Sequence, residues 1–592
     1  MLYYLRKFAS KSQTLKKLFF FIISLTLLVG TSMFAQQKKQ IIVENSDFTE
    51  RNENEVPGAV VLTGNVQIFH DGVRITCNKA YHFTDENYIK LFGNVKMNQG
   101  DSLFMDSRYA EYNGDRKFAY ATGSVVMRSP EMTLTTDTIN LDRSIQQAYY
   151  NSYGTIVNKE NTLKSKSGRY IIGQKKYEFR TAVTLTNPKY VLKSNNLDYY
   201  TNSGHSYVFG PSTITSKDDF IYTEKGFYDT RKRLAKLYTN SYIKYDTQII
   251  RGDEMFYDQN KEFATATNNV SVTDTVNKFK GTGHYAEVYR AKDSTMLTKR
   301  ALVATVVEND TLYTHAKRMI ITGKKGQRVV RGYNNARFYK IDMNGKCDSI
   351  HSNEATGLTQ LIRRPVIFNG QNQITGEVIH LISNAATEKL DSIKVLNNAF
   401  IIQKDTLGKG YNQLKGANLY GKFKDNKLSE VDLIKNTEKI YYMYDDDDAL
   451  VGIDKGLSSK IHLDIENNEI VAVTSYTNIE SDSYPDSELP ENVRKLRGFE
   501  WRGEEIIKSK DDIFPPEEQD IHDKIVEKSE KDKEKEDTPL EPLPETLNYD
   551  KNNPLPKPAA PKTEPPVTAP QKKPVTPAEK TTGLKPKPKK KP

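Results

Sequence analysis

The residues whose side chains could catalyse reactions or bind metal ions are scattered along the chain. Its 592 residues include nine histidines, two cysteines and an acidic run at 445–448. No two histidines have metal-ligand spacing on one element, and no zinc-protease, nucleophile-elbow or phosphate-loop motif occurs. The acidic run lacks the alternating oxygen ligands and the glycine of a calcium loop, so we interpret it as a solvated turn. We therefore expect no enzyme activity, no metal and no cofactor.

The two cysteines, Cys77 and Cys347, lie far apart in the sequence. An exported chain could join them, but the sequence does not show whether they lie close together. Two separate, half-buried thiols are the simpler expectation, and their pairing stays open at this point.

Apolar residues, in contrast, recur at a spacing that could bind lipid. A small residue returns at a nearly constant interval, with apolar residues two and nine places before it, and this pattern defines a 29-residue repeat. Each methylene group removed from water contributes about 0.8 kcal/mol, so several acyl chains would require many such positions. The small residues are Cys77, Ser107, Thr136, Ser165, Ser194, Thr223, Gly252 and Gly281. The candidate lipid-lining residues are Val66, Ile68, Ile75, Met97, Met105, Val125, Met127, Leu134, Ile156, Leu163, Val183, Leu185, Leu192, Ile214, Ile221, Ile243, Ile250, Val270 and Val272.

The elements that carry these columns are predicted to be short β-strands. Segments such as 66–68 and 183–185 alternate between inward and outward positions and are rich in valine, isoleucine and threonine. A column of tyrosines follows five places after the small residue, whereas an apolar column stands two places before it. This odd spacing would put the two columns on opposite faces of a regular strand, and this slip in parity predicts a bulge or corner between them. Gly-Asn pairs at 64–65 and 93–94 are interpreted as turns. The tyrosines, which we expect to pack in the core rather than stack on sugars, are Tyr112, Tyr170, Tyr199, Tyr228 and Tyr257.

Stacked repeats are predicted to build the fold. A 29-residue unit with two or three strands cannot bury its own apolar face, whereas stacked units bury a continuous one. Similar but looser units continue after residue 300, so we expect two lobes, 36–300 and 301–480, with a last hairpin at 460–475 that turns at 467–468. Because helical periodicity is nearly absent before residue 515, the predicted class is all-β and elongated.

The ends of the chain differ in composition from its middle. Residues 1–35 combine lysines, an apolar run at 18–29 and a small residue before a polar start, which predicts a cleaved secretory signal peptide, with an uncleaved anchor as the alternative. Residues 481–516 contain the only tryptophan, Trp501, and are expected to be a capping or linker segment. Residues 517–592 are expected to be a disordered tail, first charged and then rich in proline and lysine, which is either a solvated linker or a tether for anionic partners.

The net charge of +10 does not indicate a nucleic-acid-binding surface. Residues 551–592 hold 11 lysines and 2 glutamates, which contribute +9, and the segment 1–17 contributes +5. The rest of the chain therefore carries −4, from 10 − 9 − 5. A fold that binds nucleic acid would concentrate positive charge on its folded part, so we exclude that class.

Periodicity alone leaves open what the apolar columns do. They could pack on each other as the closed core of a structural envelope protein, or they could line a groove that carries acyl chains. A right-handed parallel β-solenoid that binds or cleaves polysaccharide has a similar period. Such an enzyme needs clustered carboxylates on one exposed rung, and none stand in register in this sequence.

Three segments resemble the OstA/LptA-like lipopolysaccharide transport family, also known from the organic solvent tolerance-like N-terminal domain. They are Leu-Thr-Gly-Asn-Val at 62–66, Leu-Phe-Gly-Asn-Val at 91–95 and Ala-Thr-Gly-Ser-Val at 121–125. The downstream Met-Thr-Leu-Thr-Thr-Asp-Thr-Ile at 132–139 is similar to the strand that follows in the family. The resemblance covers residues 40–300 well and 300–480 loosely, and this chain is much longer than a single bridging domain.

The resemblance implies an open β-jellyroll, bent like a taco, that binds the acyl chains of lipid A in the periplasm and has no catalytic residues. It implies lipopolysaccharide as ligand and LptC-like and LptD-like transport proteins as partners, joined by edge-strand addition, with end-to-end self-association as a further option. We expect residues 60–69 to form one docking edge, because the first strand of an open sheet is unpaired on one side.

Overall fold

The structure is a computed structural model that describes residues 39–536 except 275, 277–278, 308–309, 325, 388, 426 and 467–468. The predicted signal peptide, the predicted turn at 467–468 and the chain after residue 536 lie outside the described residues. The chain divides into two units, Met1–Lys533 and Glu534–Pro592, and every described strand belongs to the first unit. In the part of the chain that is described, no helix combines the length and the apolar character that crossing a membrane requires.

The first strands are β1 (Ile42–Asn45), β2 (Phe48–Glu50), β3 (Val60–His70), β4 (Val73–Phe83), β5 (Tyr88–Gln99), β6 (Leu103–Asn113), β7 (Phe118–Arg128), β8 (Thr133–Asp142), β9 (Gln147–Tyr150), β10 (Gly154–Val157), β11 (Thr162–Ser165), β12 (Ser167–Ile171) and β13 (Lys176–Asn187). They are followed by β14 (Tyr190–Tyr200), β15 (His205–Ser216), β16 (Asp219–Asp229), β17 (Leu234–Tyr238), β18 (Tyr242–Tyr245), β19 (Gln248–Arg251), β20 (Glu254–Asp258), β21 (Phe263–Asp274), β22 (Phe279–Tyr289), β23 (Ser294–Thr298), β24 (Leu302–Val307) and β25 (Asp310–His315).

The last strands are β26 (Arg318–Thr322), β27 (Val329–Lys340), β28 (Met343–Asn353), β29 (Leu358–Ile362), β30 (Val366–Asn369), β31 (Asn372–Thr375), β32 (Val378–Ser383), β33 (Leu390–Lys404), β34 (Tyr411–Lys424), β35 (Lys427–Tyr444), β36 (Leu450–Glu466), β37 (Glu469–Tyr476) and β38 (Glu480–Tyr484). The described helices are α2 (Pro516–Glu536) and the short 3-10 turns η1 (Arg290–Lys292), η2 (Glu491–Val493), η3 (Gly503–Glu505) and η4 (Asp511–Ile513).

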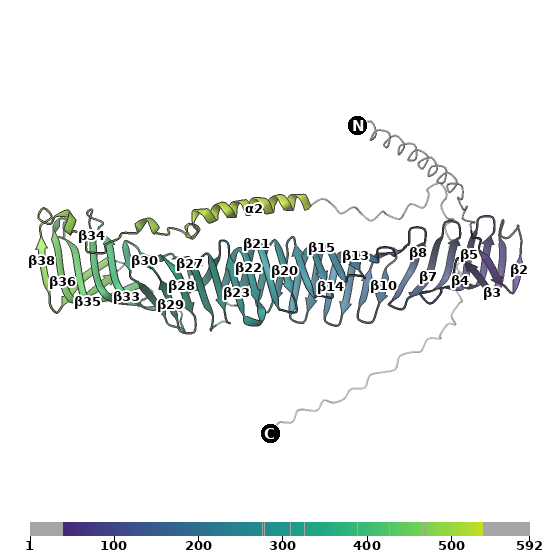
Figure 1. The fold of residues 1–592 in the computed structure, drawn as a ribbon, viewed down its shortest axis with the longest axis horizontal. Helices are drawn as coiled ribbons and strands as arrows, with labels where there is room; N and C mark the ends of the chain where they lie inside the picture. Colours follow the sequence, from purple (N-terminus) through teal and green to yellow (C-terminus); the bar gives the residue numbers. More distant parts are fainter. Residues whose placement is uncertain are drawn as a thin grey trace, which may run out of the picture. The chain divides into compact units, whose positions relative to one another are not determined.

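The strands form one sheet in which neighbours follow each other along the chain (Figure 1). Every ladder between described strands is antiparallel, from β1 on β3 to β38 on β36. The predicted class, an elongated all-β fold built from 29-residue repeats, is therefore confirmed. The parallel β-solenoid considered from the sequence is wrong, because a solenoid of that kind needs parallel neighbours.

Most long strands change direction once, at a corner where residues leave the ladder. In β3 the register passes from Thr63 to Val66, and Gly64 and Asn65 between them have φ angles of 77° and 44°. Glycine adopts this left-handed region without steric cost and asparagine tolerates it, which explains why Gly-Asn recurs here. The Gly-Asn pairs thus form corners inside strands, and the sequence interpretation of them as turns between strands is wrong.

The corner divides each repeat into two arms that face each other. We call the part that contains residues 66–70 of β3 and 73–77 of β4 arm A, and the part that contains residues 60–63 of β3 and 79–83 of β4 arm B, and we use the same names along the sheet. The line along which the hairpin turns of arm A meet those of arm B is called the mouth. The side chains between the arms form the interior.

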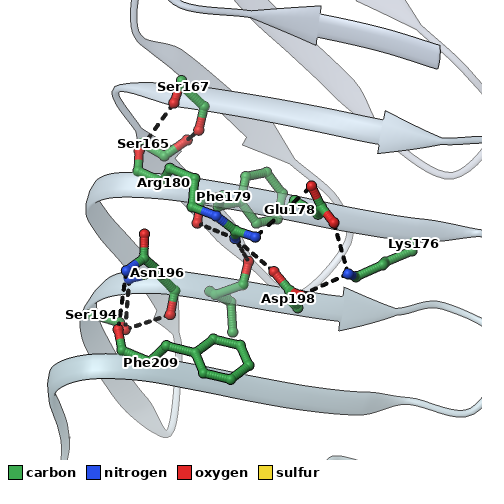
Figure 2. Close-up of polar contacts among 11 residues, drawn as sticks. Ser165, Ser167, Lys176, Glu178, Phe179, Arg180, Ser194, Asn196, Asp198 and Phe209 are labelled. Atoms are coloured by element: carbon green, nitrogen blue, oxygen red, sulfur yellow. Dashed lines mark hydrogen bonds and ion pairs between the residues drawn. The ribbon is translucent and has the colours of Figure 1, made fainter. Parts of the chain in front are cut away.

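The small residues predicted at the parity slip lie at these corners, and five of the eight share one contact. Ser194 Oγ donates to the Asn196 carbonyl at 2.8 Å, and Ser165 Oγ donates to the Ser167 carbonyl at 3.0 Å (Figure 2). The corner removes a ladder partner from these carbonyls, and the small side chain supplies a replacement donor. The same contact to the residue two places on is made by Cys77, Thr136, Thr223, Cys347 and Ser458. The predicted corner is confirmed.

Buried apolar side chains fill much of the interior. Among the described residues they form successive clusters over 41–150, 163–208 and 221–470. The last cluster passes residue 300 without a break, so the packing does not change where the sequence suggested a lobe boundary. The boundaries of the two lobes stay a prediction.

After β38 the chain returns along the outer face of arm A as a segment that we call the strap, residues 485–515. Gln413 Nε2 donates to the Arg494 carbonyl at 2.8 Å, and Gln373 Nε2 donates to the Glu500 carbonyl at 2.8 Å. Trp501 packs against Tyr411 with ring centroids 5.4 Å apart. The strap thus adds a second apolar layer on the outside of the sheet, and α2 follows it along the strands (Figure 1).

Candidate functional site

The two apolar columns of the sequence converge on a single row of interior side chains in arm A. Ile68 of β3 lies opposite Ile75 of β4, and Ile75 lies opposite Met97 of β5. Neighbouring strands are antiparallel, so a residue of one column lies directly opposite a residue of the other column. The two columns therefore alternate along a single row and do not form two separate rows. This aliphatic row consists of Val43, Ile68, Ile75, Met97, Met105, Met127, Leu134, Ile156, Leu163, Leu185, Leu192, Ile214, Ile221, Ile243, Ile250 and Val272.

Every predicted lining residue faces the interior. Those outside the aliphatic row, Val66, Val125, Val183 and Val270, lie at the corner end of arm A. All the predicted residues are buried except Ile156, Leu185 and Ile214, which are partly exposed. In this part of the molecule the arms therefore pack closely on each other, and contact of these residues with lipid stays a prediction.

The tyrosine column lies in arm B and also faces the interior. Tyr112 is buried, and its hydroxyl donates to Nδ1 of His70 at 2.7 Å, since Nε2–H of His70 donates to the Lys39 carbonyl at 2.9 Å. Burial raises the pKa of the Tyr112 hydroxyl. The ring of Tyr170 stacks on Tyr177 with centroids 4.3 Å apart. Tyr112 and Tyr257 are buried core residues, as the sequence favoured, whereas Tyr170, Tyr199 and Tyr228 are partly exposed.

A cavity of about 380 Å³ lies between the arms further along the chain, within residues 303–423. This volume falls in the range of about 300–1,000 Å³ that is typical of small-molecule pockets. The predicted lining residues all precede residue 273, so the cavity is built from residues that the sequence analysis did not select. Its apolar walls come from both arms and include Val303, Leu312 and Phe338 of arm A and Val330, Ile350 and Leu361 of arm B.

Charged side chains border the cavity at the mouth. Lys340 Nζ lies 2.8 Å from Asp342 Oδ1. Arg328 lies 3.7 Å from Asp274 across the mouth, and its guanidinium stands 4.9 Å from the centroid of the Phe279 ring.

The cavity lining also carries Asp310, Asp342 and Glu354, and both cations are paired with aspartates. An amphiphile could bury its chain in the apolar cavity while its anionic head competes with these carboxylates for Arg328 and Lys340.

Arginine–aspartate pairs connect the two arms along the mouth. In each pair the aspartate lies at a hairpin turn of arm A and the arginine at a turn of arm B. The pairs are Asp71–Arg143 at 3.4 Å, Asp219–Arg290 at 2.6 Å and Asp274–Arg328 at 3.7 Å. Burial raises the pKa of the Asp219 carboxyl, and Arg290 opposes that shift. These ion pairs hold the arms at a fixed spacing where no backbone ladder joins them.

The interior becomes polar at its C-terminal end. The inward-facing Leu414 of β34 lies opposite Lys439 of β35, so Lys439 also faces the interior. Its ammonium group forms an ion pair with Asp454 of β36, and Ser481 of β38 donates to the same carboxylate. The apolar lining of arm A therefore ends before the last strands of the sheet. At the N-terminal end, in contrast, the apolar lining extends to Val43 of β1.

The docking edge expected at residues 60–69 is covered in the structure. Strand β3 pairs with β1 and β2 on one side and with β4 on the other, so this expectation is wrong.

A buried ion cluster lies on the outer face of arm B rather than in the interior. Lys176 Nζ lies 2.7 Å from Glu178 and 2.8 Å from Asp198, and Arg180 Nη1 donates to Asp198 at 2.6 Å. Figure 2 shows these four side chains gathered on β13 and β14. Although burial acts against it, the hydrogen bonds to Asp198 and Glu178 raise the pKa of the Lys176 ammonium. The cluster ties β13 and β14 together.

Comparison with known proteins agrees with this geometry. Residues 38–195 match the model of the OstA-like protein family. The resemblance predicted from the sequence is thereby confirmed over these residues, and the antiparallel ladder continues without a break beyond them. The search of curated proteins found no match to this chain.

One solved structure that the chain resembles is LptH, the LptA homologous periplasmic component of the conserved lipopolysaccharide transport device from Pseudomonas aeruginosa. The two chains are 14% identical, the match covers 17% of this chain and 77% of that chain, and the TM-score is 0.16.

The cysteine and histidine side chains of the described residues do not assemble into a metal site. Cys77 and Cys347 are both buried and free, and burial raises their pKa values to about 11 and about 12. His284 Nε2 and His522 Nδ1 approach to 2.9 Å although 238 residues separate them, a contact for which the sequence carries no signal. Within the described part of the chain, no three His, Cys, Asp or Glu side chains are arranged to hold a metal ion.

The cavity is a candidate functional feature that sequence analysis missed. Its walls lie where the regular spacing of the repeat is lost, and the wall residues carry no fixed column of their own. The change of spacing after residue 300 is the signal that could have directed attention to this region.

Proposed function

We propose that this protein is a periplasmic component of a lipopolysaccharide transport bridge that holds acyl chains of lipid A between its arms, and that it is not an enzyme. The OstA-like match over residues 38–195 supports the pathway. The observation that carries the proposal is the apolar cavity within residues 303–423, bordered by Arg328 and Lys340. On this proposal the signal peptide at 1–35 exports the chain, and LptC-like and LptD-like proteins are its neighbours in the bridge.

The physical basis is the partition of an amphiphile. Transfer of each acyl methylene group into the cavity contributes about 0.8 kcal/mol, and a phosphate at the entrance forms charge-assisted hydrogen bonds with a guanidinium or ammonium group. The ion pairs along the mouth then have a second consequence. An anionic headgroup competes with Asp274 for Arg328, so loading is coupled to opening of the mouth at this position.

A structural envelope protein with a closed core is the second candidate, and one observation favours it. Nearly all predicted lining residues up to Val272 are buried by the opposite arm. If this packing persists in the cell, only the cavity region holds lipid, or no region does.

Photo-crosslinking to lipopolysaccharide in cells separates these functions. A photoreactive residue is placed at Leu312, which lines the cavity, and at Leu185, which is partly exposed in the aliphatic row. The adjacent residues Tyr313 and Thr184 point to the opposite face of the same strands and serve as matched controls.

Adducts at Leu312 and Leu185 but not at the controls indicate a continuous groove. Adducts at Leu312 alone restrict the lipid to the cavity. The absence of adducts at both positions, in a protein that is folded and exported, contradicts lipid transport and favours the closed core.

A further inference from the structure

The strap crosses the strands of arm A on their outer face and is held there through its backbone. Two buried glutamines, Gln373 and Gln413, each bind it with both ends of the amide. In each, Nε2 donates to a strap carbonyl, and Oε1 accepts the N–H of the residue two places further on. The strap groups belong to Glu500 and Arg502 for Gln373 and to Arg494 and Leu496 for Gln413, at 2.7 or 2.8 Å.

The two glutamines belong to one row of outward-facing residues on adjacent strands. Amide and apolar side chains alternate in this row, and its third amide, Asn344, accepts the N–H of Ile507 at 3.0 Å. Because neighbouring strands lie about 4.8 Å apart, the three amides fix the strap across about 20 Å of the sheet. The strap therefore ties the strands of this row to each other. The row consists of Gln413 of β34, Ile402 of β33, Gln373 of β31, Phe368 of β30 and Asn344 of β28.

The last part of the strap lies directly behind a wall of the cavity. On β25, β27 and β28 a cavity-lining residue is followed or preceded by an outward residue that contacts the strap. Successive residues of a strand point to opposite faces, so a single layer of strands separates the strap from the cavity. The His315 ring packs against Phe514 with centroids 5.2 Å apart. Arg337 Nη1 donates to the Ile513 carbonyl at 3.4 Å. The neighbours in sequence are Thr314 and His315, Phe338 and Arg337, and Met343 and Asn344.

This part of the strap is seated less closely than the part over the glutamines. A hollow of about 550 Å³ lies between it and the sheet, lined by cations of the sheet and by carboxylates of the strap. Their contacts are long: Lys346 Nζ lies 3.7 Å from Glu505, and Arg300 Nε is buried without a hydrogen-bond partner. Burial, with Arg337 nearby, lowers the pKa of the Lys346 ammonium. Buried charges without close partners oppose docking of the strap here.

The cavity is small for the ligand of the proposed function. Its volume of about 380 Å³ lies near the lower end of the range of about 300–1,000 Å³ that is typical of small-molecule pockets. A glycolipid with several acyl chains needs more room than this. The arms must therefore move apart at this position if such a ligand is to enter.

We propose that the strap controls access to the cavity. Docked on the outer face, it holds arm A against arm B, and when it lifts from β25, β27 and β28 these strands move outwards and admit acyl chains. The corners supply the hinge, because residues such as Asn334 and Asn335 of β27 leave the ladder there, with φ angles of 64° and 57°. The inference rests on the transport function proposed above and assigns the regulation of its site.

Lipid loading of the purified, full-length mature protein tests the proposal. A photoreactive residue at Leu312 reports lipopolysaccharide in the cavity. The strap is locked by N344C/I507C in a C77S/C347S background, closed by oxidation and reopened in the same sample with dithiothreitol. Dibromobimane joins the two thiols where oxidation is incomplete. We expect closure of the lock to lower the adduct yield by about threefold or more, and reduction to restore it.

Release of the strap should have the opposite effect. Q373L/Q413L removes both amide contacts, and faster trypsin cleavage after Lys495 shows that the strap has lifted. We expect this variant to raise the adduct yield at Leu312 by about threefold. Q360L makes the same chemical change on the outer face of arm B, where Gln360 contacts His380 at 3.1 Å, and should leave the yield unchanged.

Three results separate the possibilities. Equal adduct yields with the lock closed and open would overturn the inference. A lifted strap in Q373L/Q413L with an unchanged or lower yield would do the same, since a strap that only covers apolar surface has no influence on loading. If Q373L/Q413L does not fold, the lock decides alone. Absence of adducts in every state contradicts lipid transport itself, whereas adducts that are independent of the strap contradict only its control of the cavity.

Discussion

Arg290 donates to Asp219 at 2.6 Å and thereby joins the two arms across the mouth. Asp219 is the first residue of β16 in arm A, and Arg290 follows β22 at the end of arm B, 71 residues later. Both side chains are largely buried, with 15% and 28% of their surfaces exposed. The Tyr245 ring lies 5.0 Å below the guanidinium. The pair therefore contributes, with the other mouth pairs and the packed interior, to holding two arms whose backbones are joined only at the corners.

Arg290→Gln should destabilise the protein by about 1–3 kcal/mol, because it leaves the Asp219 carboxylate without its partner in a partly buried site. Urea denaturation at pH 7 measures this change. Lys422→Gln, which breaks an exposed pair with Glu430, should leave the free energy of unfolding nearly unchanged and serves as the control. Equal effects of the two substitutions would show that the mouth pair does not fix the arms.

Lys176→Met should destabilise the protein by about 2 kcal/mol at pH 7, because it leaves the carboxylates of Glu178 and Asp198 directly opposite each other. Thermal unfolding at pH 7 measures the change. Lys193→Met, on the exposed part of β14, should be close to neutral, and equal losses in the two variants would contradict a stabilising ion cluster.

Acidification should loosen the contact between α2 and the sheet at His284. The backbone N–H of Asn269 donates to His284 Nδ1 at 3.3 Å, so Nε2 carries the proton and donates to His522 Nδ1 at 2.9 Å, an arrangement that requires both rings to be neutral. Burial, with His522 and Arg300 nearby, lowers the pKa of His284 to about 4. The other charged groups that face the pair are Lys299, Asp253 and Asp523.

Because the folded pKa of His284 is below the ordinary value of about 6.5, its contribution to stability is complete above that pH and declines as the pH falls towards about 4. At pH 5.5 the loss is about 1.4 kcal/mol, which is about tenfold in the open population of the contact. Hydrogen exchange of residues 516–531 at pH 7.5 and pH 5.5 measures it, and His522→Gln should reduce the pH dependence. Exchange that is equal at both pH values would rule out this coupling.

Ser194→Ala should cost about 1–2 kcal/mol. It removes the donor to the Asn196 carbonyl at the corner and the partner of the buried Ser212 hydroxyl at 2.7 Å. Chemical denaturation measures the change, with Thr215→Ala at an exposed position of β15 as the control. If the two substitutions had the same effect, the corner hydrogen bond would contribute nothing beyond strand propensity.

Leu312→Trp should fill part of the cavity and lower lipopolysaccharide adducts at a photoreactive residue placed at Met343, which lines the same cavity. Stability should change little, because the added ring enters empty space instead of overpacking a closed core. Tyr313→Trp on the opposite face of β25 should leave the adduct yield unchanged. Undiminished adducts in Leu312→Trp would place the lipid outside the cavity.

The sequence predicted the local features of this fold well, because those features depend on neighbouring residues. The regular spacing of the repeat located the strands, and the parity slip located the corners that Ser165 and Ser194 stabilise. The looser units expected after residue 300 are present as strands, among them β27, β33 and β35. The role of Gly64 and Asn65 was interpreted wrongly, since a left-handed φ is common to corners within a strand and to turns between strands.

What the sequence by itself determined is the alternation of side chains, and hence the all-β class, the repeat and the inward direction of residues such as Ile68 and Leu185. What only the tertiary structure decided is how close the two arms come. That distance depends on long-range contacts such as Asp219–Arg290 and on side-chain volumes from both arms, which no spacing along the chain encodes. For this reason the two columns form one row, most of the lining over residues 66–272 is buried, and the cavity lies between Leu312 and Leu361, outside the columns identified in the sequence.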